Sequence, residues 1–188
     1  MSSGLDGVIV ALAGRRIDPA SPSQPRFPPE NIDRVRDELR QLFLRLHARA
    51  LVCSAASGAD LLALDAAGEV GLRRHVVLPF ASGRFRQTSV VDRPGPWGSL
   101  FDEIVIRAEA QGDLVVLPGV QNEDESYAIA NARLLNETEQ VANGQEGRVG
   151  CAATVVWEGE PRPGQDLTAQ FRSLARERGW PVYEVSTL

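Results

Sequence analysis

Short apolar runs alternate with longer amphipathic stretches along most of this chain of 188 residues. Each apolar run ends at turn residues, which is typical of strands that are buried on both faces of a parallel sheet. We predict strands at 7–13, 51–53, 75–80, 113–117, 149–157 and 181–185. Between these strands, apolar residues at helical spacing predict helices at 30–46, 58–70, 97–112, 124–143 and 165–178.

This alternation predicts an α/β fold, with a doubly wound, mainly parallel sheet and helices on both of its faces, as in Rossmann-like proteins. No internal repeat or low-complexity segment divides the sequence, so we expect one domain over residues 1–188. Ligands of such sheets bind beyond the carboxyl ends of the strands. A binding site is therefore expected among the loops that follow the strands.

The turn between the second predicted strand and its helix consists of small residues, Ser54 to Gly58. Small side chains leave backbone N–H groups accessible, and the first N–H groups of a helix have no intrahelical partner. The helix dipole is positive at the same end, so the turn predicts a site for a phosphate or a carboxylate. Asp60 lies three residues after Ser57, as in a capping box. We expect Gly58→Asp to abolish anion binding and to leave the fold intact.

The loops after the first three strands carry arginines and hydroxyl groups, which bind phosphate and carboxylate groups well. The segment 81–98 is the longest of these connections, and we expect it to be an irregular lid. The candidate ligand-binding residues are Gly14, Arg15 and Arg16 after the first strand, Ser54, Ala55, Ser57, Gly58 and Asp60 after the second, Arg84, Arg86, Thr88, Ser89 and Arg93 after the third, and Gly119 after the fourth.

Acidic residues follow the fourth predicted strand. Glu123 and Glu125 can act as a general acid or base or bind ribose hydroxyl groups. They can equally complement the dipole of the helix that begins there. Tyr127, Asn131 and Arg133 on the same helix can face the cleft or the solvent, and the sequence leaves both alternatives open.

All 20 basic residues are arginines, and the formal net charge is −5. Because the chain has no lysine, a P-loop and Schiff-base chemistry are excluded. The Gly-x-Gly-x-x-Gly fingerprint is also absent, so we expect neither a nicotinamide nor another cofactor. The acidic balance makes nucleic acid an improbable partner.

The two cysteines and two histidines show no metal-ligand spacing, so we expect no metal site. His47 lies within a predicted helix and His75 begins a predicted strand, at the wrong end of the sheet, so we expect no Ser/His/Asp catalytic set. The first ten residues lack the basic region of a signal peptide, and no apolar run is long enough to span a membrane. We therefore expect a cytoplasmic protein without a membrane partner. Assembly into a homo-oligomer stays open.

Two stretches resemble the signatures of the SLOG superfamily, a Rossmann-like group that contains the YspA-like, Smf/DprA-like and "lonely guy" proteins. Ala13-Gly14-Arg15-Arg16 looks like the Gly-x-Arg turn after the first strand of that group. The stretch from Ser54 to Ala63 resembles its second signature, Gly-Gly-Ala-x-Gly-Ala-Asp-x-x-Ala, with Ser54 and Ala55 in place of the leading glycines. The resemblance implies binding of a nucleotide or nucleotide-derived small molecule, as a sensor or effector module.

The resemblance also implies two alternatives. Some members hydrolyse N-glycosidic bonds and carry Pro-Gly-Gly-x-Gly-Thr-x-x-Glu after the fourth strand, whereas here Pro118-Gly119 is followed by Val120-Gln121 without the Gly-Thr pair. An N-glycosidic hydrolase or transferase acting on a nucleoside monophosphate-like substrate, through Glu123 or Glu125, is the first alternative. Binding of single-stranded nucleic acid, as in the Smf/DprA branch, is the second, and the scarcity of aromatic residues disfavours it.

Overall fold

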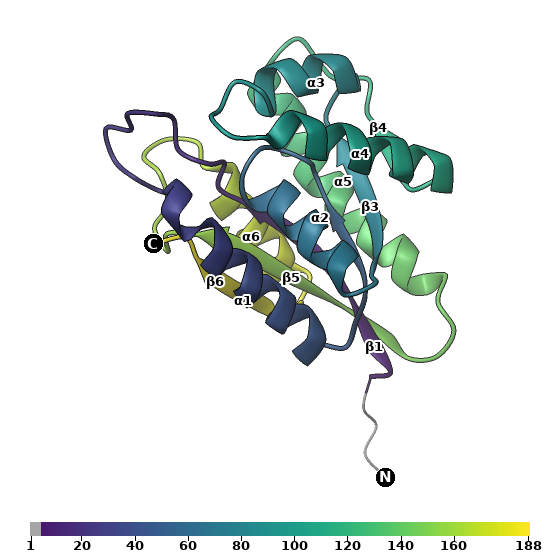
Figure 1. Cartoon of the computed structure of the whole chain (residues 1–188). Coiled ribbons are helices and arrows are strands. Elements are labelled where there is room, and N and C mark those ends of the chain that lie inside the picture. The colour runs from purple at the N-terminus through teal and green to yellow at the C-terminus, as the bar shows by residue number, and fades with distance from the viewer. Residues whose placement is uncertain (1–4) are drawn as a thin grey trace.

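A computed structural model describes residues 5–188 and contains one six-stranded sheet. The strands are β1 (Gly7–Gly14), β2 (Ala48–Cys53), β3 (Arg73–Leu78), β4 (Leu114–Val116), β5 (Val149–Trp157) and β6 (Val182–Ser186). They lie in the order β4-β3-β2-β1-β5-β6, and every neighbouring pair is parallel (Figure 1). The predicted α/β fold with a doubly wound parallel sheet is thus confirmed.

Helices cover both faces of the sheet (Figure 1). Helices α1, α2 and α4 pack on one face, with α3 beside α4, and α5 and α6 pack on the other. The helices are the short 3-10 turn η1 (Pro29–Asn31), α1 (Ile32–Arg45), α2 (Ala59–Glu69), α3 (Ser82–Ser89), α4 (Trp97–Gln111), α5 (Glu123–Asn143) and α6 (Leu167–Glu177). Among residues 5–188, none of these helices combines the length and the apolar character that a membrane span needs.

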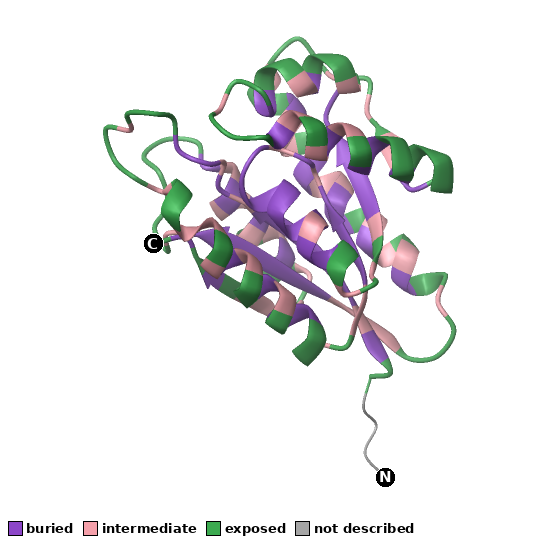
Figure 2. Ribbon diagram, viewed as in Figure 1, coloured by how far each residue is buried: buried purple, intermediate pink, exposed green. Residues whose placement is uncertain are grey.

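Side chains of β1 contribute to two hydrophobic cores, one on each face of the sheet. Val10 and Leu12 contribute to the core under α1, α2 and α4, whereas Ile9 and Ala11 contribute to the core under α5 and α6. All four side chains are fully buried, and the strands form the deeply buried centre of the molecule (Figure 2). Because helices cover both faces, the strands are apolar on both sides, and this is why they could be predicted from apolar runs.

The strand order reverses at β1, which lies between β2 and β5. Gly14 ends β1 at this point, and a Cβ atom there would lie 2.4 Å from the Cβ atom of Ala59 and 2.8 Å from the carbonyl oxygen of Val156. The absence of a side chain at Gly14 therefore lets α2 and β5 approach the end of β1. In open parallel sheets, such a reversal point opens a crevice in which ligands bind.

The segment 81–98 is not irregular, and the prediction of its conformation is wrong. Its first half forms α3, and only residues 90–96 lie between α3 and α4 without regular structure. The reason is the packing of Phe85, which is fully buried and stacks on Phe101 with ring centroids 6.0 Å apart. The other predicted helices and strands are present, and their ends differ by a few residues from the predicted ends.

Candidate functional site

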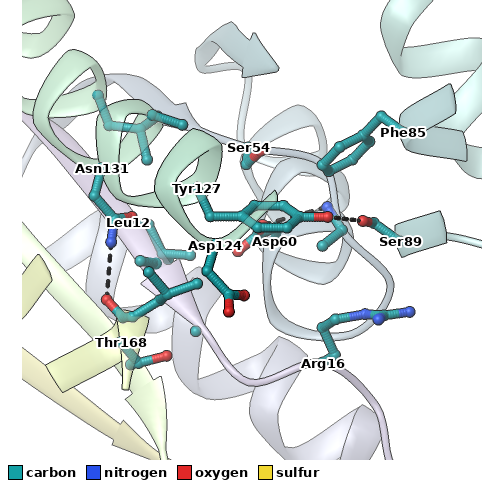
Figure 3. A pocket seen from close by; sticks show the side chains of 16 residues that line it. Leu12, Arg16, Ser54, Asp60, Phe85, Ser89, Asp124, Tyr127, Asn131 and Thr168 are labelled. Atoms are coloured by element: carbon teal, nitrogen blue, oxygen red, sulfur yellow. Dashed lines mark hydrogen bonds between the residues drawn. The ribbon is translucent and has the colours of Figure 1, made fainter. Parts of the chain in front are cut away.

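Two adjoining pockets lie at the carboxyl end of β1. The first, which we call the apolar pocket, has a volume of about 220 Å³. It is lined by Leu12, Ala13, Gly14, Arg16, Ser54, Ala56, Asp60, Phe85, Ser89, Asp124, Tyr127, Ala130, Asn131, Leu134, Leu167 and Thr168 (Figure 3). This pocket opens at the point where the strand order reverses.

The second pocket, which we call the polar pocket, has a volume of about 440 Å³. It is lined by Gly14, Arg15, Arg16, Ile17, Asp18, Pro19, Pro22, Ser23, Gln24, Arg26, Arg93, Asp124, Arg162, Gln165, Asp166, Leu167 and Thr168. The two pockets share Gly14, Arg16, Asp124, Leu167 and Thr168. They therefore form one continuous cleft that changes from apolar to charged along its length.

Aromatic rings from α3 and α5 form part of the wall of the apolar pocket (Figure 3). The Tyr127 ring lies edge-on to Phe80 with centroids 5.7 Å apart, and its centroid is 6.5 Å from that of Phe85. The Tyr127 hydroxyl group is 2.6 Å from the Ser89 hydroxyl group, which fixes the ring between the two helices. Leu12 adds aliphatic surface. Such walls suit a flat ring system.

Asp60 contributes a carboxyl group to the lining of the apolar pocket. The residue is 7% exposed, and its Oδ2 accepts a hydrogen bond from the backbone N–H of Ala56 at 3.3 Å. Burial raises the pKa of Asp60 to about 7, although the backbone N–H groups of Ala56 and Gly14 and the charge of Arg16 oppose this shift. The guanidinium of Arg16 forms its ion pair with Asp92. The protonation state of Asp60 therefore changes near neutral pH.

The predicted exposure of the N–H groups at the start of α2 is wrong for three of them. The Ser57 N–H donates to the carbonyl oxygen of Ser89 at 2.9 Å, and the Ala59 N–H donates to the carbonyl oxygen of Arg15 at 3.0 Å. The Ala56 N–H donates to Asp60, as described above. The protein thus uses the N–H groups of Ala56, Ser57 and Ala59 itself.

Gly58 joins this turn to the loop after β1. Its φ is +100°, and a Cβ atom would lie 2.3 Å from the backbone nitrogen of Ile17 and 2.8 Å from the carbonyl oxygen of Arg15. The structure therefore contradicts the expectation that Gly58→Asp leaves the fold intact. Ser57 is fully buried, and its hydroxyl oxygen accepts hydrogen bonds from Arg16 at 3.4 Å. Its side chain does not cap α2, so the predicted role of Ser57 in a capping box is also wrong.

Arg15 is buried in an ion-pair network beside the polar pocket. Its guanidinium donates to both carboxylate oxygens of Asp166, at 2.8 and 2.7 Å, and to Glu158 at 2.6 Å. Arg26 pairs with the same Glu158 carboxylate. Burial opposes the ionisation of Asp166, but hydrogen bonds from Arg15 and from backbone N–H groups outweigh it, and the pKa of Asp166 lies well below its ordinary value. Arg15 thus holds the loop after β1 against α6.

Three other arginines of the polar pocket are less fully paired. Arg16 pairs with Asp92, and the Nε atom of Arg93 lies 3.8 Å from the other oxygen of that carboxylate without a hydrogen-bond partner. Arg162 makes no ion pair with any of residues 5–188, and burial together with two neighbouring arginines lowers its pKa. An anion would relieve this concentration of positive charge. These three arginines therefore give the polar pocket its least compensated positive charge.

Three predicted residues on α3 have partners away from both pockets. Arg84 forms an ion pair with Glu123. Arg86 donates to both oxygens of Asp102, at 2.8 and 2.9 Å. The Thr88 hydroxyl group donates to the carbonyl oxygen of Arg84 at 3.2 Å and is exposed. None of the three lines the cleft, whereas Ser89 at the end of the same helix does.

Of the other predicted residues, Ser54 lines the cleft, whereas Ala55 and Gly119 do not. Ser54 lines the apolar pocket, with its hydroxyl group donating to the carbonyl oxygen of Val77 at 2.9 Å. Ala55 is fully buried beside it and lines neither pocket. Gly119 has a φ of +74° and packs against Phe80, where a Cβ atom would lie 2.9 Å from the Phe80 Cβ atom. Gly119 therefore shapes the turn after β4 and is not part of the cleft.

Of the three acids at the start of α5, the one that lines the cleft is Asp124, which lies between the two predicted glutamates. Glu123 pairs with Arg84, Glu125 is exposed, and neither lines a pocket. Asp124 lines both pockets (Figure 3). Tyr127 and Asn131 share its helix face at positions i+3 and i+7, and this spacing was the signal in the sequence that could have identified Asp124.

Asn131 and Arg133 on α5 differ in where they point. Asn131 lines the apolar pocket and donates to the carbonyl oxygen of Leu167 at 2.9 Å, which ties α5 to the start of α6. Arg133 pairs with Glu137 at 2.9 Å on the same helix. Sequence reasoning missed Arg162 and Thr168, because both follow β5 and the sequence does not reveal that β5 lies beside β1.

Among residues 5–188, no group of three or more histidine, cysteine, aspartate and glutamate side chains is arranged to hold a metal ion. No family model matches the chain, and no curated protein is significantly similar to it. What the protein binds is therefore inferred from the chemistry of its own cleft.

Proposed function

We propose that this protein binds a nucleotide or nucleotide-derived small molecule in the cleft and acts as a sensor or effector module of the SLOG type. The observation that carries the proposal is the order of chemistry along the cleft. Aromatic walls come first, then a carboxylate, then arginines. The apolar pocket is smaller than the range of about 300–1,000 Å³ typical of sites for drug-sized ligands, so it suits a single ring system such as a base.

The boundary between the pockets suits a ribose. Asp124 lines both pockets, and a carboxylate in such a position can accept hydrogen bonds from sugar hydroxyl groups, as carboxylates do in dinucleotide sites. Beyond it, Arg16, Arg93 and Arg162 offer guanidinium groups to a phosphate. Both stretches that resemble SLOG signatures border this cleft, which agrees with the proposal.

Calorimetric titration of nucleoside monophosphates and of the matching nucleosides tests the proposal. We expect at least one monophosphate to bind about tenfold or more tightly than its nucleoside, because charge-assisted hydrogen bonds to phosphate contribute about 1.5–3 kcal/mol. Arg162→Gln should weaken binding of the monophosphate and leave binding of the nucleoside unchanged. Arg107→Gln is the matched control, because Arg107 is exposed on α4 and pairs only loosely with Glu103, at 3.6 Å. Equal affinities for nucleosides and monophosphates would contradict the phosphate site.

Cleavage of an N-glycosidic bond is the second candidate function, and the position of Asp124 favours it. A base in the apolar pocket and a phosphate in the polar pocket would place the glycosidic bond near the boundary that Asp124 lines. A carboxylate there can stabilise the positive charge that develops on the sugar during cleavage. Assays of base release, described in the Discussion, distinguish this enzyme from a binding protein.

A further inference from the structure

The apolar pocket holds an acidic group, Asp60, that forms no ion pair with any of residues 5–188. Asp60 lies on the first turn of α2, is 7% exposed, and lines a cavity whose walls include Leu12, Phe85 and Tyr127 (Figure 3). Burial of a carboxylate in such surroundings is costly unless a partner compensates its charge. The nearby Arg16 pairs with Asp92 instead. A proton or a ligand therefore has to neutralise Asp60.

Burial favours the protonated form of Asp60. Asp124 from α5 lines the same pocket and brings no positive charge to it. Cys53 at the end of β2 stays a neutral thiol, because burial and the neighbouring Asp60 raise its pKa well above the ordinary value. Tyr127 offers a neutral hydroxyl group that α3 already engages. The charge of Arg16 and the backbone N–H groups of Ala56 and Gly14 stabilise the carboxylate, but burial outweighs them and raises the pKa of Asp60 to about 7.

A protonated carboxyl group presents one O–H donor beside one carbonyl acceptor. We propose that Asp60 is the specificity-determining residue of the apolar pocket and binds, through this pair, a heterocycle in which a basic ring nitrogen lies beside an amino group, as on an edge of adenine. The inference rests on the proposed function and names the ligand class for the same site. In the complex the Asp60 O–H donates to the ring nitrogen, and the amino group of the ring donates to the carbonyl oxygen of Asp60; no covalent bond forms or breaks.

Deaza analogues of AMP isolate this contact, because each replaces one ring nitrogen by C–H. We expect either 1-deaza-AMP or 7-deaza-AMP, whichever lacks the nitrogen that faces Asp60, to bind about tenfold more weakly than AMP at pH 6. The ratio of the affinity for AMP to the affinity for this deaza analogue should fall as the pH rises above 7. At that pH Asp60 is a carboxylate, which repels the lone pair of the ring nitrogen. Titration of the phosphate affects both ligands alike and cancels in the ratio.

Two substitutions at Asp60 separate recognition from folding. Asp60→Asn keeps a donor, an acceptor and the hydrogen bond from Ala56, so it should keep the tenfold ratio and lose its pH dependence. Asp60→Leu should bind AMP and the deaza analogue equally. Asp65→Asn on the same helix is the control, because Asp65 pairs with Arg36 at 3.2 Å outside the pocket and should behave as the unmodified protein. Asp60→Asn gives a decisive result even if Asp60→Leu fails to fold.

The results of these titrations test the role of Asp60 separately from the proposed function. Equal binding of AMP and both deaza analogues overturns the role of Asp60, and so does an Asp60→Asn variant that keeps the pH dependence. If adenosine binds as tightly as AMP while the deaza effect persists, the phosphate site of the proposed function fails and the role of Asp60 stands. If AMP does not bind at all, the role of Asp60 is overturned, and the titration of the other monophosphates decides the proposed function.

Discussion

The hydroxyl groups of Ser89 and Tyr127 lie 2.6 Å apart, and this hydrogen bond joins the end of α3 to α5 beside the apolar pocket. The carbonyl oxygen of Ser89 also accepts a hydrogen bond from the Ser57 N–H at 2.9 Å. Ser89 therefore connects α3, α5 and the turn before α2, three segments that border one cavity. A ligand that contacts any one of these segments acts on all three.

We expect Tyr127→Phe to loosen this connection. The substitution keeps the ring and removes the hydroxyl group, so it should lower the free energy of unfolding by about 0.5–1.5 kcal/mol, the usual net contribution of one hydrogen bond. Amide hydrogen exchange along α3 should become faster. Tyr183→Phe is a control on β6, far along the sheet from α3. Unchanged exchange in α3 would show that the hydrogen bond does not anchor the helix.

The sheet could be predicted because its strands are apolar on both faces. The strand Val149–Trp157 was predicted with both of its ends, and the predicted helix 97–112 ends at Gly112, which adopts the left-handed conformation typical of helix ends, with a φ of +74°. Helix α3 could not be predicted in the same way. Phe85 is its single large apolar residue, and contacts with rings from other helices stabilise it.

The cleft could be predicted only in part. Gly14, Arg16, Ser54, Asp60 and Ser89 line the apolar pocket, because they follow strands that neighbour one another in sequence as well as in space. The sequence does not reveal that the Arg15 guanidinium is occupied, since its partners lie 143 and 151 positions away along the chain. Local patterns carry no information about such pairs.

Gly58 should tolerate no side chain. Gly58→Ala places a Cβ atom 2.3 Å from the backbone nitrogen of Ile17 at a φ of +100°. Backbone strain of this kind costs about 1–3 kcal/mol, and the backbone clash adds to it, so we expect a total loss above about 3 kcal/mol in urea unfolding. Gly71→Ala is the matched control: its φ is +77° with nothing within 4 Å, and it should cost only about 1 kcal/mol. Similar losses for the two variants would contradict the importance of the close approach.

Asp166→Asn should destabilise the protein strongly, because it leaves the buried Arg15 without its bidentate partner. Removal of one member of a buried ion pair costs about 3–5 kcal/mol. The pKa values of Asp166 and Glu158 are lowered in the folded protein, so the stabilisation is present above their ordinary values of 3.8 and 4.5 and is lost as the pH falls below them. Thermal unfolding between pH 3 and 7 should show a weaker acid dependence in the variant. Asp37→Asn, which removes an exposed pair with Arg40, should change stability by less than about 1 kcal/mol.

Asp60→Asn should make stability less dependent on pH between 3.8 and about 7. The pKa of Asp60 is raised by burial from 3.8 to about 7, so the folded protein holds this proton more tightly than the unfolded chain does. Stability is therefore greatest below the ordinary pKa and falls as the pH rises through 7. Relative to the unmodified protein, the variant should gain on the order of 2–3 kcal/mol between pH 5 and pH 8. If the free energy of unfolding changes with pH in the same way in both proteins, Asp60 ionises in the folded protein without cost. Asp65→Asn is the control and should show the pH dependence of the unmodified protein.

Little or no base should be released from nucleoside monophosphates over hours, as judged by chromatography. The turn after β4, which carries the Pro-Gly-Gly-x-Gly-Thr signature in the hydrolase branch, here places Gly119 against Phe80 and contributes no residue between Pro118 and Glu123 to either pocket. Glu125 is exposed, so Glu125→Gln should have no effect. Robust release that disappears in Asp124→Asn and persists in both Glu125→Gln and the surface variant Glu177→Gln would identify a glycosidase that uses Asp124, and it would replace the sensor as the function of this cleft.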